Sequence, residues 1–144
     1  MTDKVVLYVE DEDAAWMLFE SAVKSARLPI HLYRASDGEE ALSFLRSTRN
    51  GNDSLRPDLL ILDLGLPRKD GWELLNEIRA DPQLNNIPIV VFTSSAMPGD
   101  MRRTMELGAH AYVTKPFTYD DFLKAVDIVC SYLPPGAKAA KNQP

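Results

Sequence analysis

The chain has 144 residues, of which 45% are hydrophobic and 26% are charged, and it carries a formal net charge of -5. These values predict one soluble domain with a hydrophobic core, and the acidic balance argues against nucleic-acid binding, which depends on Lys and Arg contacts to phosphates. No apolar signal segment or membrane-length apolar run is present, so we expect a cytoplasmic protein without a membrane contact. Cys130 is the only cysteine, so an internal disulfide and a thiolate metal site are excluded.

The first third of the chain predicts two strands and two helices. The apolar run 5–9 predicts a strand that ends abruptly at the acidic segment 10–13, and this segment begins an amphipathic helix. Residues 30–34 predict a second strand. The segment Ser36-Asp37-Gly38-Glu39 has the capping-box pattern that begins a second helix, and a polar connection follows over 49–57.

The middle of the chain contains its most apolar strand. Leu59-Leu60-Ile61-Leu62 has no polar alternation, which predicts a strand that is buried on both faces. The run stops at Asp63, and a loop with Gly and Pro follows over 65–70. The next helix begins at about Gly71 and is stopped by Asp81-Pro82.

The last third repeats the same order of elements. Residues 89–92 predict a fourth strand, and 99–107 predict a weaker helix. A fifth strand is expected over 111–114 and a final helix over 119–133. The segment 134–144, rich in Ala, Lys, Asn, Gln and Pro, predicts a disordered tail.

The alternation of strand and helix predicts an α/β fold with a doubly wound, five-stranded parallel sheet and helices on both faces. The carboxyl ends of parallel strands open at one edge of the sheet, where ligands bind. The residues that directly follow the strands are therefore candidate site residues. They are Glu10, Asp11, Asp63, Thr93 and Lys115.

These five residues predict one kind of chemistry. Three carboxylates at one edge repel each other unless a cation offsets their charge, and oxygen ligands without His or Cys favour Mg²⁺ or Mn²⁺ over zinc. Lys115 and Thr93 add a positive charge and a hydroxyl donor, which hold an anionic oxygen group. Together they predict a metal-assisted transfer of a phosphoryl group onto Asp63.

The motifs resemble those of response-regulator receiver domains in two-component signalling. The resemblance covers about residues 4–133 and rests on motifs in matching order and spacing. These motifs are Val9-Glu10-Asp11, Leu62-Asp63-Leu64-Gly65-Leu66-Pro67, Asp70-Gly71, Thr93-Ser94 and Lys115-Pro116-Phe117. It implies a flavodoxin-like (βα)5 fold with strand order 2-1-3-4-5, and a receiver domain over 1–133 followed by the tail 134–144.

The resemblance also implies roles for the site residues. Asp63 would accept a phosphoryl group from a histidine kinase, and Lys115 would pair first with this carboxylate and then with the phosphoryl oxygens. Asp11, Asp63 and the backbone carbonyl of Gly65 would bind Mg²⁺ directly, whereas Glu10 would act largely through water.

Three further expectations follow from the same resemblance. Thr93 would move to hydrogen-bond the phosphoryl group, Tyr112 would turn inward behind it as a switch, and the Lys115–Pro116 peptide would be cis. Other roles remain open for these residues. Thr93 can cap a turn, Tyr112 can be a packing residue of its strand, and Lys115 can be a solvated surface charge.

The partners are expected to bind the receiver surface, because the segment after residue 133 is too short for an output domain. The final helix carries a core stripe and a second apolar stripe of Ala125, Ile128 and Tyr132, which predicts a partner surface and a homodimer. The segments 49–57, 67–70 and 80–82 resemble stand-alone receivers that partner bacterial phytochrome kinases.

Two other functions remain as alternatives. A phosphatase of the haloacid-dehalogenase type also uses a strand-end Asp with Mg²⁺, but it normally has a second Asp where Gly65 stands. A receiver-like interaction module that is never phosphorylated usually lacks the acceptor, an acid or the lysine, and all three are present here. We therefore expect a phosphoacceptor that assists its own phosphorylation and dephosphorylation, and not an enzyme with another substrate.

Overall fold

The computed structural model describes residues 3–48 and 56–134. Most of the predicted polar connection 49–57 and the predicted tail from residue 135 onward lie outside the described residues. Among the helices of 3–48 and 56–134, none is long and apolar enough to cross a membrane.

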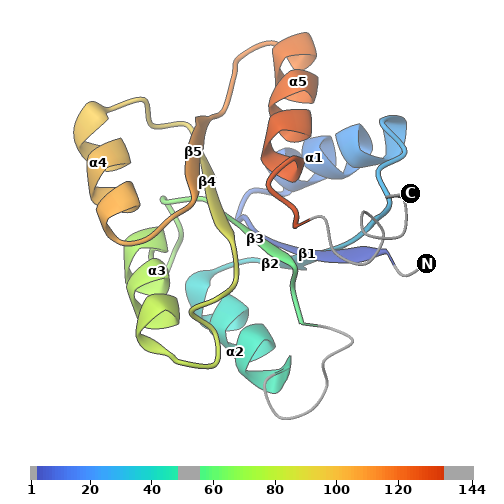
Figure 1. Ribbon diagram of the computed structural model, residues 1–144. Helices are drawn as coiled ribbons and strands as arrows, with labels where there is room; N and C mark the ends of the chain where they lie inside the picture. The colour runs from blue at the N-terminus through green and yellow to red at the C-terminus, as the bar shows by residue number, and fades with distance from the viewer. Residues whose placement is uncertain (1–2, 49–55, 135–144) are drawn as a thin grey trace, which may run out of the picture.

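Strands and helices alternate along the whole described chain, as the sequence predicts (Figure 1). The strands are β1 (Lys4–Val9), β2 (Ile30–Ala35), β3 (Leu59–Leu62), β4 (Ile89–Thr93) and β5 (Ala111–Thr114). The helices are α1 (Asp13–Ser25), α2 (Gly38–Thr48), α3 (Gly71–Ala80), α4 (Pro98–Glu106) and α5 (Tyr119–Cys130). All strand pairs are parallel and the strand order is β2-β1-β3-β4-β5, so the predicted topology is confirmed.

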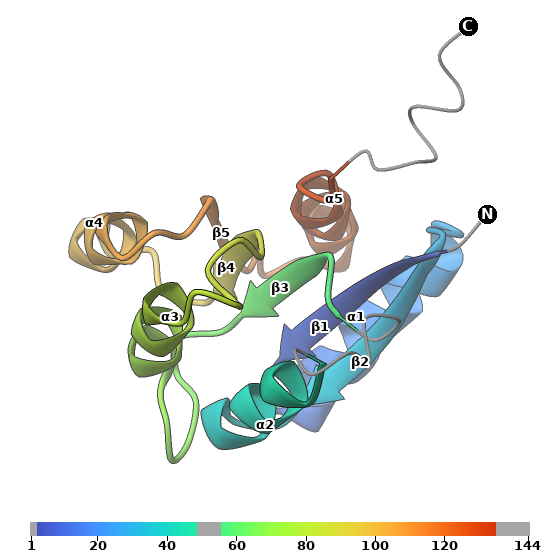
Figure 2. The ribbon, with the colours of Figure 1, turned by 60° about the horizontal axis from the view of Figure 1, so that its bottom comes forward.

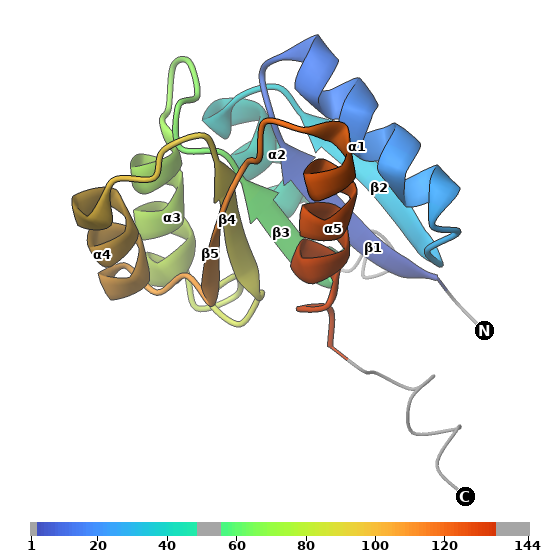
Figure 3. The same cartoon turned by 90° about the horizontal axis from the view of Figure 1, so that it is seen from above.

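Alternation of side chains along the strands builds one core on each face of the sheet. In β1, Val6 and Tyr8 face α1 and α5, whereas Leu7 and Val9 belong to the core on the α2 and α3 face. Figures 2 and 3 show α1 and α5 together on one face of the sheet, α2 and α3 on the other, and α4 beside the edge strand β5. Burial on both faces explains why β3 has no polar residue.

The helix starts follow from short polar side chains. Asp70 forms a capping box with Glu73 at the start of α3. At α2 the predicted capping box is displaced by one residue, because Asp37 accepts from the Glu40 N–H and the Glu40 side chain accepts from the Ser36 N–H. Ser36 was therefore the wrong cap, although a helix does begin at the predicted place.

Gly71 allows the start of α3 to lie directly against the end of β3. A Cβ atom on Gly71 would lie 2.6 Å from the Asp63 carbonyl oxygen and 2.7 Å from the Leu64 Cα. A side chain at this position would therefore displace the backbone that carries Asp63.

Two expectations, one about α5 and one about the segment that precedes it, are wrong. Ala125 does not belong to an exposed stripe, because it packs in the core beside Val126 and is only 4% exposed. The Lys115–Pro116 peptide is trans, since the described chain contains no cis peptide bond.

Candidate phosphoryl-transfer site

The register of the central strands brings the candidate residues to one edge of the sheet. Val9 lies beside Leu62, and Leu62 lies beside Val91. The Asp63 N–H donates to the Val9 carbonyl over 3.2 Å, and the Lys115 N–H donates to the Thr93 carbonyl over 2.7 Å. Residues that directly follow β1, β3, β4 and β5 therefore converge at this edge.

Three carboxylates form the acidic part of the site. Glu10, Asp11 and Asp63 each offer an oxygen, and these three oxygens lie within 4.8 Å of one another. Glu10 is fully buried, Asp63 is 8% exposed and Asp11 is exposed. Three oxygen ligands at this spacing, with no His or Cys among them, fit a hard divalent cation such as Mg²⁺ or Mn²⁺.

Lys115 bridges two of these carboxylates. Its Nζ lies 2.5 Å from Glu10 Oε1 and 3.1 Å from Asp63 Oδ2. Burial lowers the pKa of Lys115, but the charges and hydrogen bonds of Asp63 and Glu10 outweigh burial, so the pKa lies above its ordinary value. Lys115 therefore carries its positive charge inside the site.

Glu10 experiences the opposite balance. Burial raises the pKa of Glu10, and the hydrogen bond and charge of Lys115 only partly offset this rise. The nearby charge of Asp63 raises the pKa further. Without Lys115, a buried carboxylate at this position would be strongly unfavourable in its charged form.

The other oxygen of Asp63 is also engaged. The Thr93 hydroxyl donates to Asp63 Oδ1 over 2.8 Å, and the Gly65 N–H donates to the same atom over 3.4 Å. Thr93 is buried, so its hydroxyl is a component of the site and not a solvated turn cap. The predicted site residues Asp63, Thr93, Lys115, Glu10, Asp11 and Gly65 all lie at this edge of the sheet.

Tyr112 lies on β5, and the hydrogen bond of its hydroxyl is to the segment after Thr93 and not to Asp63. Its ring is half-buried against the core on the α2 and α3 face, and its hydroxyl donates to the Ser95 carbonyl over 2.8 Å. Tyr112 thus connects β5 to the segment that follows Thr93. Its expected role as a switch stays a prediction.

The site opens into a cleft of about 540 Å³. Trp72 lines this cleft together with Asp63, and its Nε1–H donates to the Thr104 hydroxyl over 3.1 Å. The Arg103 guanidinium lies 4.1 Å from the centre of the indole ring. Nothing in the local pattern around Trp72 distinguishes a cleft wall from a core position.

Sequence reasoning also missed the hydroxyl of Tyr8, which donates to Glu10 Oε1 over 3.0 Å. A signal for this contact was present, because residues two apart on a strand point to the same face of the sheet. Tyr8 and Glu10 have this spacing at the end of β1.

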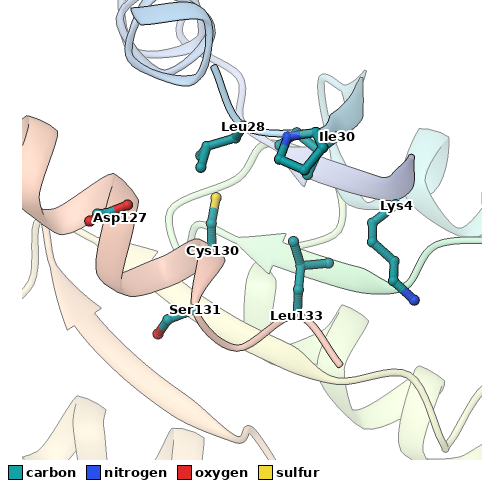
Figure 4. A pocket seen from close by; sticks show the side chains of 8 residues that line it. Lys4, Leu28, Ile30, Asp127, Cys130, Ser131 and Leu133 are labelled. Carbon is teal, nitrogen blue, oxygen red and sulfur yellow. The ribbon is translucent and has the colours of Figure 1, made fainter. Parts of the chain in front are cut away.

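A second cavity of about 310 Å³ lies at the opposite end of the strands (Figure 4). Leu28, Ile30, Cys130 and Leu133 supply most of its apolar wall. None of the clustered carboxylates lines it, so it is separate from the phosphoryl-transfer site. Cys130 is buried and belongs to the core on the α1 and α5 face.

Comparison with known proteins identifies the family. Residues 6–127 match the model of the response regulator receiver domain. Response regulator Rcp1 of Synechocystis sp. is 38% identical over 129 residues, which cover 90% of this chain and 88% of Rcp1.

Two solved structures give the same result at the level of the fold. The phosphorylated cyanobacterial phytochrome response regulator RcpA superposes with a TM-score of 0.82 at 33% identity, over 92% of this chain and 94% of RcpA. The Mn²⁺-bound form of Rcp1 superposes with a TM-score of 0.79 at 38% identity, over 90% of this chain and 93% of Rcp1. The family match, the shared strand order and the acidic cluster agree, and the chain belongs to the response regulator receiver domain family.

Proposed function

We propose that this protein is a response regulator that accepts a phosphoryl group on Asp63 from a histidine kinase in a reaction that needs Mg²⁺ or Mn²⁺. The observation that carries this proposal is the environment of the Asp63 carboxylate. One of its oxygens accepts from Thr93 and the other from Lys115, and two more carboxylates lie within 4.8 Å. This arrangement combines a nucleophile, two donors and a cation site.

The donor set suits the cation that receiver domains use. Asp11, Asp63 and the Gly65 carbonyl would hold it directly, and Glu10 would act through water. The bound cation would offset negative charge on the acceptor carboxylate and on the incoming phosphoryl oxygens. The Mn²⁺-bound form of Rcp1, at 38% identity, supports the choice of a divalent cation.

The remaining residues act on the phosphoryl group itself. An Asp63 oxygen attacks phosphorus while the bond from phosphorus to the histidine nitrogen of the kinase breaks. Lys115 and Thr93, which donate to Asp63 before transfer, then donate to the phosphoryl oxygens. The product is an acyl phosphate on Asp63.

A test measures the intact mass after incubation with Mg²⁺ and acetyl phosphate. We expect the wild type to gain one phosphoryl mass that is labile to base, and Asp63→Asn to gain none. An unchanged wild-type mass in the presence of Mg²⁺ would support an unphosphorylated interaction module. Continuous release of inorganic phosphate from acetyl phosphate without a mass gain would support a hydrolase.

We infer that the kinase partner is a phytochrome. RcpA is a cyanobacterial phytochrome response regulator. It is 33% identical to this chain, and the alignment covers 94% of RcpA. The expected result is phosphate transfer from an autophosphorylated phytochrome kinase to the wild type and not to Asp63→Asn. Equal transfer from an unrelated histidine kinase would contradict this choice of partner.

The homodimer remains a proposal for α5. Ile128 on α5 is 52% exposed and Tyr132, two residues after the end of α5, is 41% exposed, so both leave apolar surface uncovered without the buried Ala125. We expect Ile128→Lys to lower the mass measured by light scattering from dimer to monomer. The matched control is Lys124→Ala on the same helix, and an unchanged dimer in Ile128→Lys would exclude this surface.

A further inference from the structure

We propose that the Tyr8 hydroxyl is a positioning group for phosphoryl transfer, because it keeps the Glu10 carboxylate satisfied when Lys115 turns to the phosphoryl group. This inference rests on the proposed function of Asp63. Tyr8 does not contact Asp63 itself, so it would act through Glu10.

The Glu10 carboxylate has three donors in the described structure. The Tyr8 hydroxyl lies 3.0 Å and the Lys115 Nζ lies 2.5 Å from the same oxygen, Oε1. The backbone N–H of Glu12 donates to the other oxygen over 3.1 Å. Oε1 is therefore shared between one donor that belongs to the core and one that also contacts Asp63.

The Tyr8 hydroxyl is fixed in place by the packing of its ring. Tyr8 is fully buried, and its ring centre lies 4.6 Å from that of Phe19, 6.1 Å from that of Trp16 and 6.5 Å from that of Phe92. Such a ring cannot follow a moving partner. The hydroxyl therefore supplies a permanent donor to Glu10 from the core side.

Lys115 differs because it has two acceptors. In the proposed reaction its Nζ must donate to phosphoryl oxygens at Asp63, and this movement weakens its contact with Glu10 Oε1. Glu10 is fully buried, so an Oε1 without a donor would oppose the movement. The Tyr8 hydroxyl removes this opposition because it remains bonded to Oε1.

The direction of the expected effect follows from this competition. Without the hydroxyl, Glu10 depends on Lys115 alone at Oε1, so Lys115 stays with Glu10 and transfer slows. A hydrogen bond to a charged group contributes enough to change the rate roughly tenfold. Binding of the small phosphodonor should change little, because Tyr8 does not line the cleft.

The experiment compares Tyr8→Phe with the wild type in phosphorylation by acetyl phosphate at saturating Mg²⁺, followed by intact mass. We expect the maximal rate to fall roughly tenfold while the half-saturating donor concentration stays the same. The matched control is Tyr33→Phe on the neighbouring strand β2. It removes a hydroxyl from a half-buried ring that packs against Phe44. This control should keep the wild-type rate.

A double variant separates a positioning role from a purely structural one. Because Tyr8 is proposed to act through the charged Glu10, Tyr8→Phe should cause no further loss in a Glu10→Gln background. An equal loss in both backgrounds, or a wild-type rate in Tyr8→Phe, would overturn the inference. Circular dichroism checks that Tyr8→Phe folds, and this substitution keeps the ring that packs against Phe19 and removes only the hydroxyl.

The two proposals fail in different ways. A wild type that gains no phosphoryl mass would overturn the proposed function together with this inference. A wild type that is phosphorylated, with Tyr8→Phe phosphorylated at the same rate, would overturn the inference alone.

Discussion

Single residues in this protein show how burial and charge act together on one side chain. Glu10 is fully buried, and burial raises its pKa against the opposing charge of Lys115. Lys115 has the reverse situation, because the charges of two carboxylates outweigh the effect of burial on its pKa. The two side chains therefore stabilise each other's charged forms, and removal of Lys115 would leave the buried Glu10 carboxylate without its cationic partner.

Cys130 provides a pH prediction that can be isolated by one substitution. Burial, aided by the charge of Asp127, raises the pKa of the Cys130 thiol from 9.0 to about 12. Above pH 9 the unfolded chain loses this proton while the folded chain keeps it, so the free energy of unfolding falls as the pH rises. The contribution of the neutral Cys130 thiol to the free energy of unfolding is fully present below pH 9 and is lost by about pH 12.

The measurement is urea unfolding of the wild type and Cys130→Ala at pH 8 and pH 10. From pH 8 to pH 10, we expect the free energy of unfolding of the wild type to fall by about 1 kcal/mol relative to that of Cys130→Ala. A difference that does not depend on pH would mean that the folded thiol titrates normally.

At the scale of elements, the start of α3 determines the position of Asp63. Asp70 caps this helix, and Gly71 brings its first turn against the backbone of Asp63 and Leu64. The loop between β3 and α3 is further joined to α2, because Arg68 pairs with the buried Asp37. The position of Asp63 is thus set by the end of β3 and by the start of α3, which packs against its backbone.

Gly71→Ala should therefore affect both stability and the site. The added Cβ would meet the Asp63 carbonyl at 2.6 Å, so we expect the free energy of unfolding to fall by about 1–3 kcal/mol. Affinity for Mg²⁺ should fall with it, because the Asp63 backbone must shift. Calorimetry measures both quantities.

Gly99→Ala is the matched control for this substitution. Gly99 lies in α4, and no atom stands within 4 Å of the position of its Cβ. Alanine should leave the stability unchanged or raise it by up to about 1 kcal/mol, because glycine disfavours a helix. Equal losses in the two variants would show that close approach is not the cause.

At the scale of the whole molecule, one edge of the sheet collects charge while the central strand β3 is entirely apolar. The acidic cluster draws on β1 and β3, and Lys115 approaches from the end of β5. Repulsion among the three carboxylates opposes folding, and Lys115 offsets only part of it. A cation that binds the folded cluster should therefore stabilise the complete domain.

We expect Mg²⁺ at ten times its dissociation constant to raise the free energy of unfolding by about 1.4 kcal/mol. Thermal unfolding with and without Mg²⁺ measures this change. Asp11→Asn should remove most of the gain, because Asp11 belongs to the cluster. Asp127→Asn on α5 should keep it, and an equal gain in Asp11→Asn would place the cation elsewhere.

Much of the fold could be predicted because its signals are local. The apolar runs ended close to the observed strand ends, and the site residues were identified from their position directly after those strands. Ser36 was a wrong cap because Asp37 offers an equally suitable side chain one residue later. Ala125 was misassigned because helical periodicity does not tell which neighbours cover a small residue at the margin of a core stripe.

The sequence by itself determined the alternation of elements, the parallel sheet and the residues at its carboxyl edge, because periodicity and strand ends are properties of contiguous residues. Only the tertiary structure decided that Lys115 contacts Glu10 as well as Asp63, that Trp72 lines the cleft, and that the peptide before Pro116 is trans. These features depend on distances between segments that are far apart in the chain or on a choice between two allowed backbone states. Such distances are set by packing of the whole domain, and no local pattern carries them.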